Sequence, residues 1–276
     1  KIEQILKSEN YEAGIELLKT LDEPELNEAL ADLIQSTVKE KYFVHEMACS
    51  GSYPPDEERD KVVETNFNKG FQILFTLLPN IKKLVLNNNH IEDDGIYALS
   101  QSNMFCNLES LFLANNDLTT DSAISISESR TLTQLKSLDI NNNDIRAEGT
   151  KALSESPNLK SIEYLDLGQN GLGSDGAKAL AQSPNMETLK FLRLNNNNIK
   201  DAGISEMAVS KYFTSLEYLF LENENWIHSE GAKSIAVSTA FPLLRILVLT
   251  LNAIGDEGAF HLAGENNLNT LEQLNV

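Results

Sequence analysis

Two aspartates stand where acid–base chemistry could be arranged. Asp139 and Asp166 each follow the central leucine of one sequence motif, in two consecutive copies. On neighbouring strands their carboxylates would be close enough to perturb each other's pKa. Paired carboxylates can act as general acid and general base where water is excluded. The surrounding pattern predicts an open sheet face, so we do not expect catalysis there.

The histidines and cysteines show no catalytic or metal-binding spacing. His45, His90, His228 and His261 occur at unrelated positions of the motif or before it begins. Nucleophilic catalysis needs a Ser or Cys beside an oriented base. The sequence also has no glycine-rich phosphate loop and no zinc-type Cys or His cluster. We therefore expect no enzyme activity, no metal and no cofactor.

One motif, Leu-x-x-Leu-x-Leu-x-x-Asn, recurs along most of the chain and must position these residues. Its alternating Leu-x-Leu part predicts a short strand with one buried face, and a helical pattern follows each strand. Because each strand returns after a helical crossover, we expect a parallel sheet. The central leucines recur at an interval of 27, with one step of 28, and are Leu84, Leu111, Leu138, Leu165, Leu192, Leu219, Leu247 and Leu274.

Each predicted strand is followed by an asparagine and then by signals for a helix start. The asparagine has the same place after the leucine in six copies, and its side chain can bond peptide groups of the turn, so we interpret it as structural. An acidic or small polar residue and a glycine then precede apolar residues at helical spacing. The sixth copy differs, because residues 222–227 contain one extra position and the single tryptophan, Trp226. A bulged loop and a specificity element both fit this segment.

Residues 165–180 and 192–203 resemble leucine-rich repeats of the ribonuclease-inhibitor-like class. The resemblance extends over residues 81–276 and implies an α/β fold, a right-handed α/β solenoid of about seven and a half repeats. In this horseshoe the parallel sheet lines the concave face and the helices lie on the convex face. Mammalian ribonuclease inhibitor itself is rich in cysteine, often at the asparagine position. This chain keeps asparagine and has two cysteines, so we do not identify it as that protein.

Residues 1–80 lack the motif but have helical patterning. Apolar residues recur at helical spacing from Ile2 to Leu21, and again from Val62 to Leu78, directly before the first predicted strand. We expect this region to form an α-helical N-terminal cap that covers the apolar end of the repeat array. A separate module that recruits another protein is the alternative.

The charge of the chain limits its partners. The net charge is −19, from 22 basic and 41 acidic residues, which disfavours nucleic acid and suits a basic protein partner. The same acidity also keeps a long repeat protein in solution. No apolar run approaches the ~18 residues that a membrane span requires. The sequence does not determine the oligomeric state.

The two cysteines, Cys49 and Cys106, do not form a disulfide framework, which favours a reducing, cytoplasmic location. The chain starts at Lys1 rather than Met and ends at Val276 within a predicted strand. We therefore expect a trimmed or processed chain, and a lost signal peptide leaves a secreted effector open.

The concave face is the predicted functional surface. Residues one before, one after and three after each leucine point away from the core. Tyr164, Phe191 and Tyr218 then form one aromatic row across strands about 4.8 Å apart. Packing between strands is the competing explanation for this row. The predicted partner-binding residues are Phe112, Asp139, Tyr164, Asp166, Phe191, Arg193, Tyr218, Phe220, Glu222 and Trp226.

These observations favour a non-enzymatic scaffold that binds another protein through its concave sheet. Two alternatives stay open. The resemblance includes Ran GTPase-activating protein, which permits regulation of a small GTPase. A bacterial effector that acts on host proteins would use the same surface. The sequence does not identify the partner, because proteins with this repeat bind unrelated targets.

Overall fold

The computed structural model describes residues 81–264 and 267–276, so the predicted cap over residues 1–80 lies outside the described residues. Eight parallel strands form one sheet in the order β1 to β8. The strands are β1 (Lys83–Val85), β2 (Ser110–Phe112), β3 (Ser137–Asp139), β4 (Tyr164–Asp166), β5 (Phe191–Arg193), β6 (Tyr218–Phe220), β7 (Ile246–Val248) and β8 (Gln273–Asn275).

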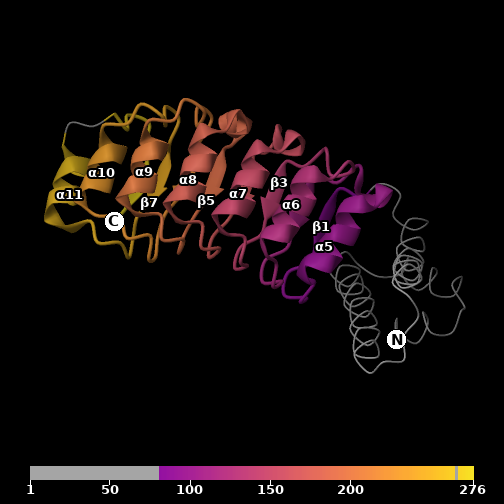
Figure 1. Cartoon of the computed structure of the whole chain (residues 1–276). Helices are drawn as coiled ribbons and strands as arrows, with labels where there is room; N and C mark the ends of the chain where they lie inside the picture. Colours follow the sequence, from indigo (N-terminus) through magenta and orange to yellow (C-terminus); the bar gives the residue numbers. More distant parts are fainter. Residues whose placement is uncertain (1–80, 265–266) are drawn as a thin grey trace, which may run out of the picture.

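Within the described residues, one α-helix follows each of the first seven strands. The α-helices are α5 (Glu92–Gln101), α6 (Thr120–Glu128), α7 (Arg146–Glu155), α8 (Gly173–Gln182), α9 (Lys200–Ala208), α10 (Ser229–Ala236) and α11 (Gly255–Ala263). Short 3-10 helices η1 (Asn103–Phe105), η2 (Pro157–Leu159) and η3 (Pro184–Thr188) lead back toward the next strand. Figure 1 shows the helices side by side in one row and the strands in a second row behind them.

The two rows have different natural spacings. Strands in a sheet lie about 4.8 Å apart, whereas packed helices lie about 8–10 Å apart. Stacking one strand and one helix per repeat therefore curves the array, with the sheet on the shorter, inner side. We call the side of the sheet that faces away from the helices the inner face.

The predicted register is confirmed along the whole sheet. Leu84 pairs with Leu111, and each central leucine pairs with the next one up to Leu247 and Leu274. The leucines of β1 to β7 are buried between sheet and helices, and a slip by one residue would turn them to the inner face. Leu274, in β8 at one end of the described sheet, is 37% exposed and is the exception to the predicted core.

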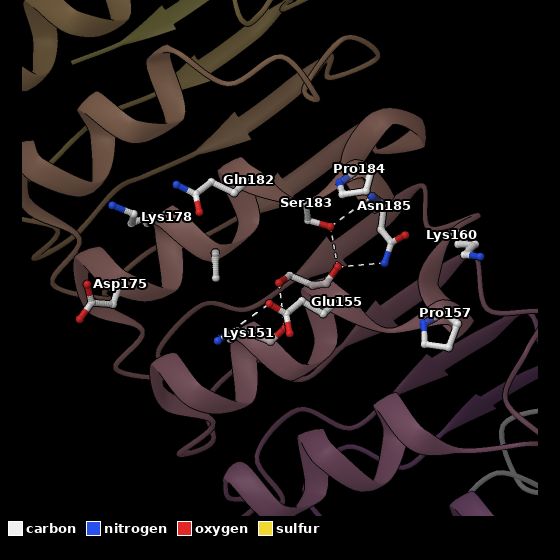
Figure 2. Close-up of a pocket in the computed structure, with 12 residues that line it drawn as sticks. Lys151, Glu155, Pro157, Lys160, Asp175, Lys178, Gln182, Ser183, Pro184 and Asn185 are labelled. Carbon is white, nitrogen blue, oxygen red and sulfur yellow. Dashed lines mark hydrogen bonds and ion pairs between the residues drawn. The ribbon is translucent and has the colours of Figure 1, made fainter.

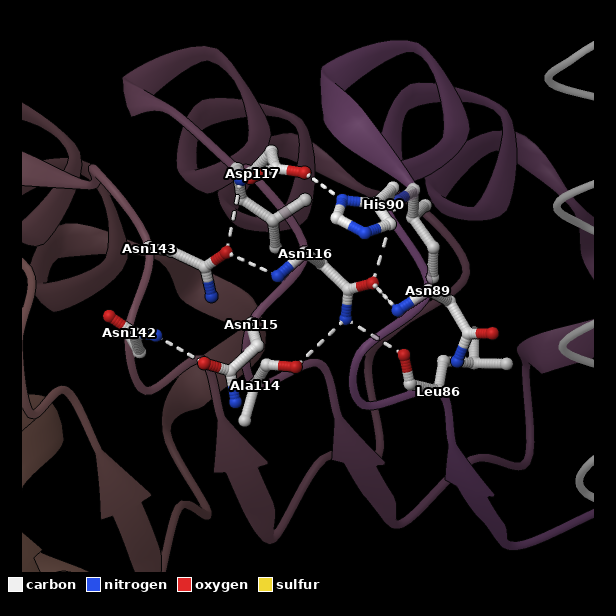
Figure 3. A network of polar contacts seen from close by, with 11 residues as sticks. Leu86, Asn89, His90, Ala114, Asn115, Asn116, Asp117, Asn142 and Asn143 are labelled. Atoms are coloured by element: carbon white, nitrogen blue, oxygen red, sulfur yellow. Dashed lines mark hydrogen bonds and ion pairs between the residues drawn. The ribbon is translucent and has the colours of Figure 1, made fainter.

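The predicted structural role of the asparagines is confirmed by an asparagine ladder (Figure 3). Asn116 accepts a hydrogen bond on Oδ1 from Asn89 N at 2.9 Å and donates one from Nδ2 to Leu86 O at 2.8 Å. Its own backbone N donates to Oδ1 of Asn143 in the next repeat at 2.9 Å. Each side chain thus satisfies peptide groups of its neighbour in the turn, where the strand has ended and the helix has not begun.

The sixth repeat keeps this ladder with Asn225, one position later than the other repeats. Asn225 Oδ1 accepts from Asn197 N at 3.0 Å, and its Nδ2 donates to Leu194 O at 2.8 Å. Upstream, Asn196 N contacts two carbonyls, those of Glu222 and Asn223, at 3.1 and 2.8 Å. The extra residue is therefore a bulge placed before the asparagine, as one of the two sequence-based interpretations predicts.

A serine ladder joins the helix C-termini on the opposite edge of the array. The hydroxyl of Ser156 donates to Ser127 O at 2.7 Å, and that of Ser210 donates to Ala181 O at 2.5 Å. These bonds satisfy carbonyls that the last helical turn leaves free. The serines in this position are Ser129, Ser156, Ser183, Ser210 and Ser238.

A column of alternating charge precedes the strands, two residues before each central leucine. Glu109 lies between Lys82 and Lys136, at 2.6 and 2.7 Å, and hydrogen bonds from these lysines lower its pKa to about 2. Each charged residue of the column lies beside residues of opposite charge in the neighbouring repeats, which stabilises the observed pairing of strands. Pairing shifted by one repeat would place like charges side by side. Its members are Lys82, Glu109, Lys136, Glu163, Lys190, Glu217, Arg245 and Glu272.

Candidate functional site

Aromatic side chains form a continuous row on the inner face. The rings of Tyr164 and Phe191 are stacked, with centroids 4.4 Å apart and planes 13° apart. Phe191 also contacts Tyr218 at 6.2 Å and Phe220 at 5.1 Å, and Phe112 lies 6.3 Å from Tyr164. Strand register brings them together, because Tyr164 pairs with Phe191 and Phe191 pairs with Tyr218. All five are partly exposed, so they offer apolar area to solvent.

Arg193 links the aromatic row to the acidic residues. Its guanidinium lies 5.5 Å from the centre of the Phe191 ring and 4.9 Å from that of Phe220. It also forms an ion pair with Asp166 at 3.3 Å. A cation over aromatic faces is held in one orientation by the ring quadrupoles. The cluster is therefore arranged before any partner binds.

Asp166 differs from its predicted role as an exposed contact residue. Its side chain is only 3% exposed. Oδ1 accepts hydrogen bonds from Gly168 N at 3.0 Å and from Asn141 Nδ2 at 3.3 Å, while Oδ2 pairs with Arg193. Side chains from the repeats on both sides cover it, so Asp166 fixes Arg193 rather than presenting its own charge.

Burial raises the pKa of both inner-face aspartates. Desolvation is the main cause for Asp139 and for Asp166, and the charge of Asp166 adds to the effect on Asp139, as their spacing predicts. Desolvation together with both carboxylates raises the pKa of Tyr164 to about 12. The Tyr164 phenol therefore stays protonated at neutral pH and can donate a hydrogen bond.

Replacing Asp139 by Asn should stabilise the fold at neutral pH. The raised folded-state pKa means that the folded state binds protons more tightly, so the stability that Asp139 contributes falls as pH rises through that pKa. Asn keeps an oxygen for the bond from Asn141 N, which Asp139 Oδ1 accepts at 3.0 Å. We expect Asp139→Asn to raise the midpoint of thermal unfolding at pH 7 and to leave it unchanged near pH 3, as measured by circular dichroism. A lower midpoint at pH 7 would contradict this account of the carboxylate.

Trp226 does not lie on the sheet, contrary to the prediction that groups it with the inner face. It follows the ladder asparagine Asn225 in the loop between β6 and α10, beyond the end of the strand, as His90 and Asp117 do in their repeats. It is 53% exposed on the rim where strands lead into helices. Leu251, 77% exposed, lies on the same rim in the next repeat, where Ile227 N donates to Asn252 Oδ1 at 3.2 Å. Leu251 was not predicted as a site residue.

Leu251 has an unusual backbone for its residue type. Its φ is +58°, a left-handed conformation that suits Asn and Gly and costs other residues roughly 1 kcal/mol. The same position in other repeats, also at positive φ, holds Asn88, Asn115, Asn142, Gln169 and Asn196.

We expect Leu251→Asn to stabilise the protein by about 1 kcal/mol, because Asn tolerates this conformation and no buried contact is lost. Urea unfolding followed by circular dichroism measures the change. A destabilised variant would show that the Leu251 side chain packs against the array. An exposed leucine in a strained backbone conformation is consistent with a binding role for Leu251 on the surface.

The helix side carries an open groove of about 630 Å³ between α7 and α8 (Figure 2). Lys151, Lys160 and Lys178 line it, together with Glu155 and Asp175. Lys151 lies 4.0 Å from Glu155, and Lys178 lies 3.2 Å from Glu206 outside the groove. In the described part of the chain, the buried side-chain atoms that lack hydrogen-bond partners all belong to the inner-face side. The groove is therefore a weaker candidate for a ligand-binding site than the inner face.

Residues 81–264 and 267–276 contain no group of three or more His, Cys, Asp or Glu side chains that could hold a metal ion. No helix among the same residues has both the length and the apolar character needed to cross a membrane.

Sequence comparison identifies the repeats. A family model described as Leucine Rich repeat matches residues 78–100, 131–154, 158–181, 185–208 and 242–263. Together with the single parallel sheet and its alternating helices, this shows that the chain contains leucine-rich repeats folded as an α/β solenoid. The comparison with curated proteins gave no match.

Solved structures with a similar fold include two leucine-rich repeat proteins. An internalin from Listeria monocytogenes is 25% identical, with a TM-score of 0.49, and the match covers 73% of this chain and 49% of that chain. The Arabidopsis receptor kinase HAESA ectodomain, in complex with an extended IDA peptide hormone, is 18% identical with a TM-score of 0.33. That match covers 65% of this chain and 39% of the ectodomain. This chain thus spans about half of the first protein's length and less of the second.

Proposed function

We propose that this protein is a non-enzymatic scaffold that binds another protein through the inner face of its leucine-rich repeats. The observation that carries the proposal is the aromatic row from Phe112 to Phe220, which is partly exposed and already ordered by Arg193. Rigid aromatic side chains and arginine are enriched at the centres of protein interfaces. Because the cluster is ordered in advance, a partner would lose little side-chain entropy there.

The proposal includes a partner with basic patches. Asp139, Asp166 and Glu222 carry three negative charges on this part of the inner face against the positive charge of Arg193, which leaves a net charge of −2. Arg245, which donates to the Tyr218 hydroxyl at 3.2 Å, is itself paired with Glu217 and Glu272. The whole chain carries −19. An acidic field of this kind speeds association with basic proteins and slows it with acidic ones.

The proposal also assigns the repeats to the ribonuclease-inhibitor-like class. The interval of 27 or 28 between equivalent positions supports this assignment, as does the α-helix of 8 to 10 residues in each repeat. The inner face itself supports a binding role rather than catalysis. Asp139 and Tyr164 are only partly buried on an open sheet face, and Asp166 is held in an ion pair by Arg193, so the two carboxylates do not share a closed pocket of the kind that acid–base catalysis needs.

Photo-crosslinking tests the proposed function. p-Benzoylphenylalanine placed at position 191 would lie within the aromatic row, whereas the same residue at position 97 would lie on the exposed side of α5. We expect position 191 to crosslink a protein from native lysate and position 97 to give no such product. Crosslinking from position 97 alone would contradict the proposed binding face.

A further inference from the structure

Three buried polar atoms in the described residues lack hydrogen-bond partners, and all three lie around the same part of the inner face. They are Nε of Arg193, Oδ1 of Asn195 and Oε2 of Glu222. Arg193 ends β5, Asn195 follows two residues later, and Glu222 has the same place after β6. Buried polar atoms without partners are rare, because each forfeits its hydrogen bonds to water. Three such atoms on two neighbouring strands indicate a place that a ligand completes.

Asn195 is held in this position by its neighbours. It is only 9% exposed, and its Oδ1 lies above Gly168, where a Cβ on the glycine would collide with it. Asn141 Nδ2 approaches the same glycine and would collide with that Cβ as well. Glycine at position 168 thus leaves room for both amide groups over β4. The Asn195 oxygen is an acceptor without a donor.

Glu222 and Asp139 are the two carboxylates of this cluster that form no ion pair with a described residue, and only Glu222 also has a buried oxygen without a hydrogen-bond partner. Asp166 pairs with Arg193 at 3.3 Å, whereas Glu222 forms no ion pair with any described residue. Phe220 precedes it by two residues on the same face of β6, and Tyr218 precedes it by four. Aromatic faces stabilise a cation and can pack against the aliphatic part of a long basic side chain.

The free atoms also define the hydrogen bonds that a ligand must supply. Two are acceptors and one is a donor, so the ligand needs at least two donor groups and one acceptor. A polypeptide provides both kinds, because each residue other than proline carries one N–H and one C=O. The ligand charge follows from the net −2 of the cluster. A carboxylate aimed at Arg193 would meet Asp166 and Glu222 as well, which disfavours an acidic ligand.

We infer that the inner face around β5 and β6 binds an extended, basic peptide segment of the partner, with one Lys or Arg side chain bonded to Glu222. Binding displaces the side chains that cover Asn195 Oδ1 and Arg193 Nε, so that neighbouring peptide groups of the segment donate to the first atom and accept from the second. This inference rests on the proposed function and specifies the chemistry of the partner.

Peptide selection on the full chain tests the inference. Random 12-residue peptides displayed on phage are selected on the wild type, and the recovered sequences are synthesised and their Kd values measured by fluorescence anisotropy. We expect one Lys or Arg to recur beside aromatic or aliphatic residues. Glu222→Gln should weaken these peptides by at least about tenfold, because it removes a charged hydrogen bond. The matched control Glu224→Gln, which removes the same charge from the exposed end of the bulge, should change Kd by about twofold or less.

A double-mutant cycle locates the contact. Replacing the recurring peptide Arg by citrulline, or Lys by norleucine, should cost at least about tenfold against the wild type and about twofold or less against Glu222→Gln. Equal losses against both proteins would show that the cation binds elsewhere and would overturn the inference. Selection of acidic or uncharged peptides would overturn it as well.

The same selected peptides distinguish a failure of the proposed function from a failure of the inference alone. Peptides that bind the inner face should lose affinity when Tyr164, Phe191 and Tyr218 are all replaced by Ala. Peptides that bind this triple variant as tightly as the wild type, or an absence of selected peptides, would contradict the proposed function together with the inference. Peptides that depend on the aromatic row but show no preference for Lys or Arg would contradict the inference alone.

Discussion

Replacing Asn197 by Leu should destabilise the centre of the array by at least about 3 kcal/mol. Oδ1 of Asn197 accepts from Asn170 N at 2.9 Å and from Leu172 N at 3.3 Å. Its Nδ2 donates to Leu167 O at 2.8 Å and to Asn195 O at 3.3 Å. Asn197 is 1% exposed, so water cannot replace these bonds, and each buried peptide group left unpaired costs about 1–3 kcal/mol.

Urea unfolding monitored by circular dichroism measures this loss. Because each repeat contacts mainly its neighbours, we also expect a broader transition, as the two halves of the array begin to unfold separately. Asn107→Leu, the same change at an exposed turn residue, should alter the free energy of unfolding by about 0.5 kcal/mol or less. Unfolding of the two variants at the same urea concentration would show that the asparagine ladder does not stabilise the array.

Replacing Tyr164, Phe191 and Tyr218 together by Ala should reduce affinity for the partner by at least about 100-fold. A single aromatic side chain at an interface centre is often worth about 2 kcal/mol or more, roughly a 30-fold change. The three rings are partly exposed, so their loss removes less packing energy than the loss of three core leucines would. We expect the variant to remain folded, as judged by circular dichroism, and to fail to capture the partner that the wild type captures.

A matched triple variant controls for the number of apolar side chains removed. Tyr97, Val209 and Phe260 are exposed apolar residues of α5, the end of α9 and α11, on the helix side. Replacing them by Ala should leave affinity for the partner within about twofold of the wild type, since single exposed apolar residues need no partner. Equal loss of binding in both variants would point to a general effect of surface hydrophobicity.

The fold follows from the sequence because its determinants repeat. The nearly constant interval between leucines fixes one strand and one helix per repeat, and the leucines fix the register, because a slip would expose every one of them. The same alignment of repeats shows the alternation of Lys82, Glu109, Lys136 and Glu163 two residues before the leucines. This alternation occupies a single position of the aligned repeats, so it could have been predicted from the sequence.

The site was harder to predict, because its geometry depends on contacts between repeats. Asp166 occupies an outward-facing position by the alternation of the strand, yet Asn141 and Arg193 from the two adjacent repeats cover it. Trp226 directly follows the ladder asparagine Asn225, beyond the end of β6, so the alternation of strand residues does not specify its position. The aromatic row was predictable, since strand register alone brings Tyr164, Phe191 and Tyr218 together.

A structure of the full chain bound to its captured partner tests the central claim, that the inner face is the binding surface. Partner atoms should lie within about 4 Å of the rings of Tyr164, Phe191 and Phe220. A partner seated on the row of helices, with these rings still open to solvent, would contradict the claim.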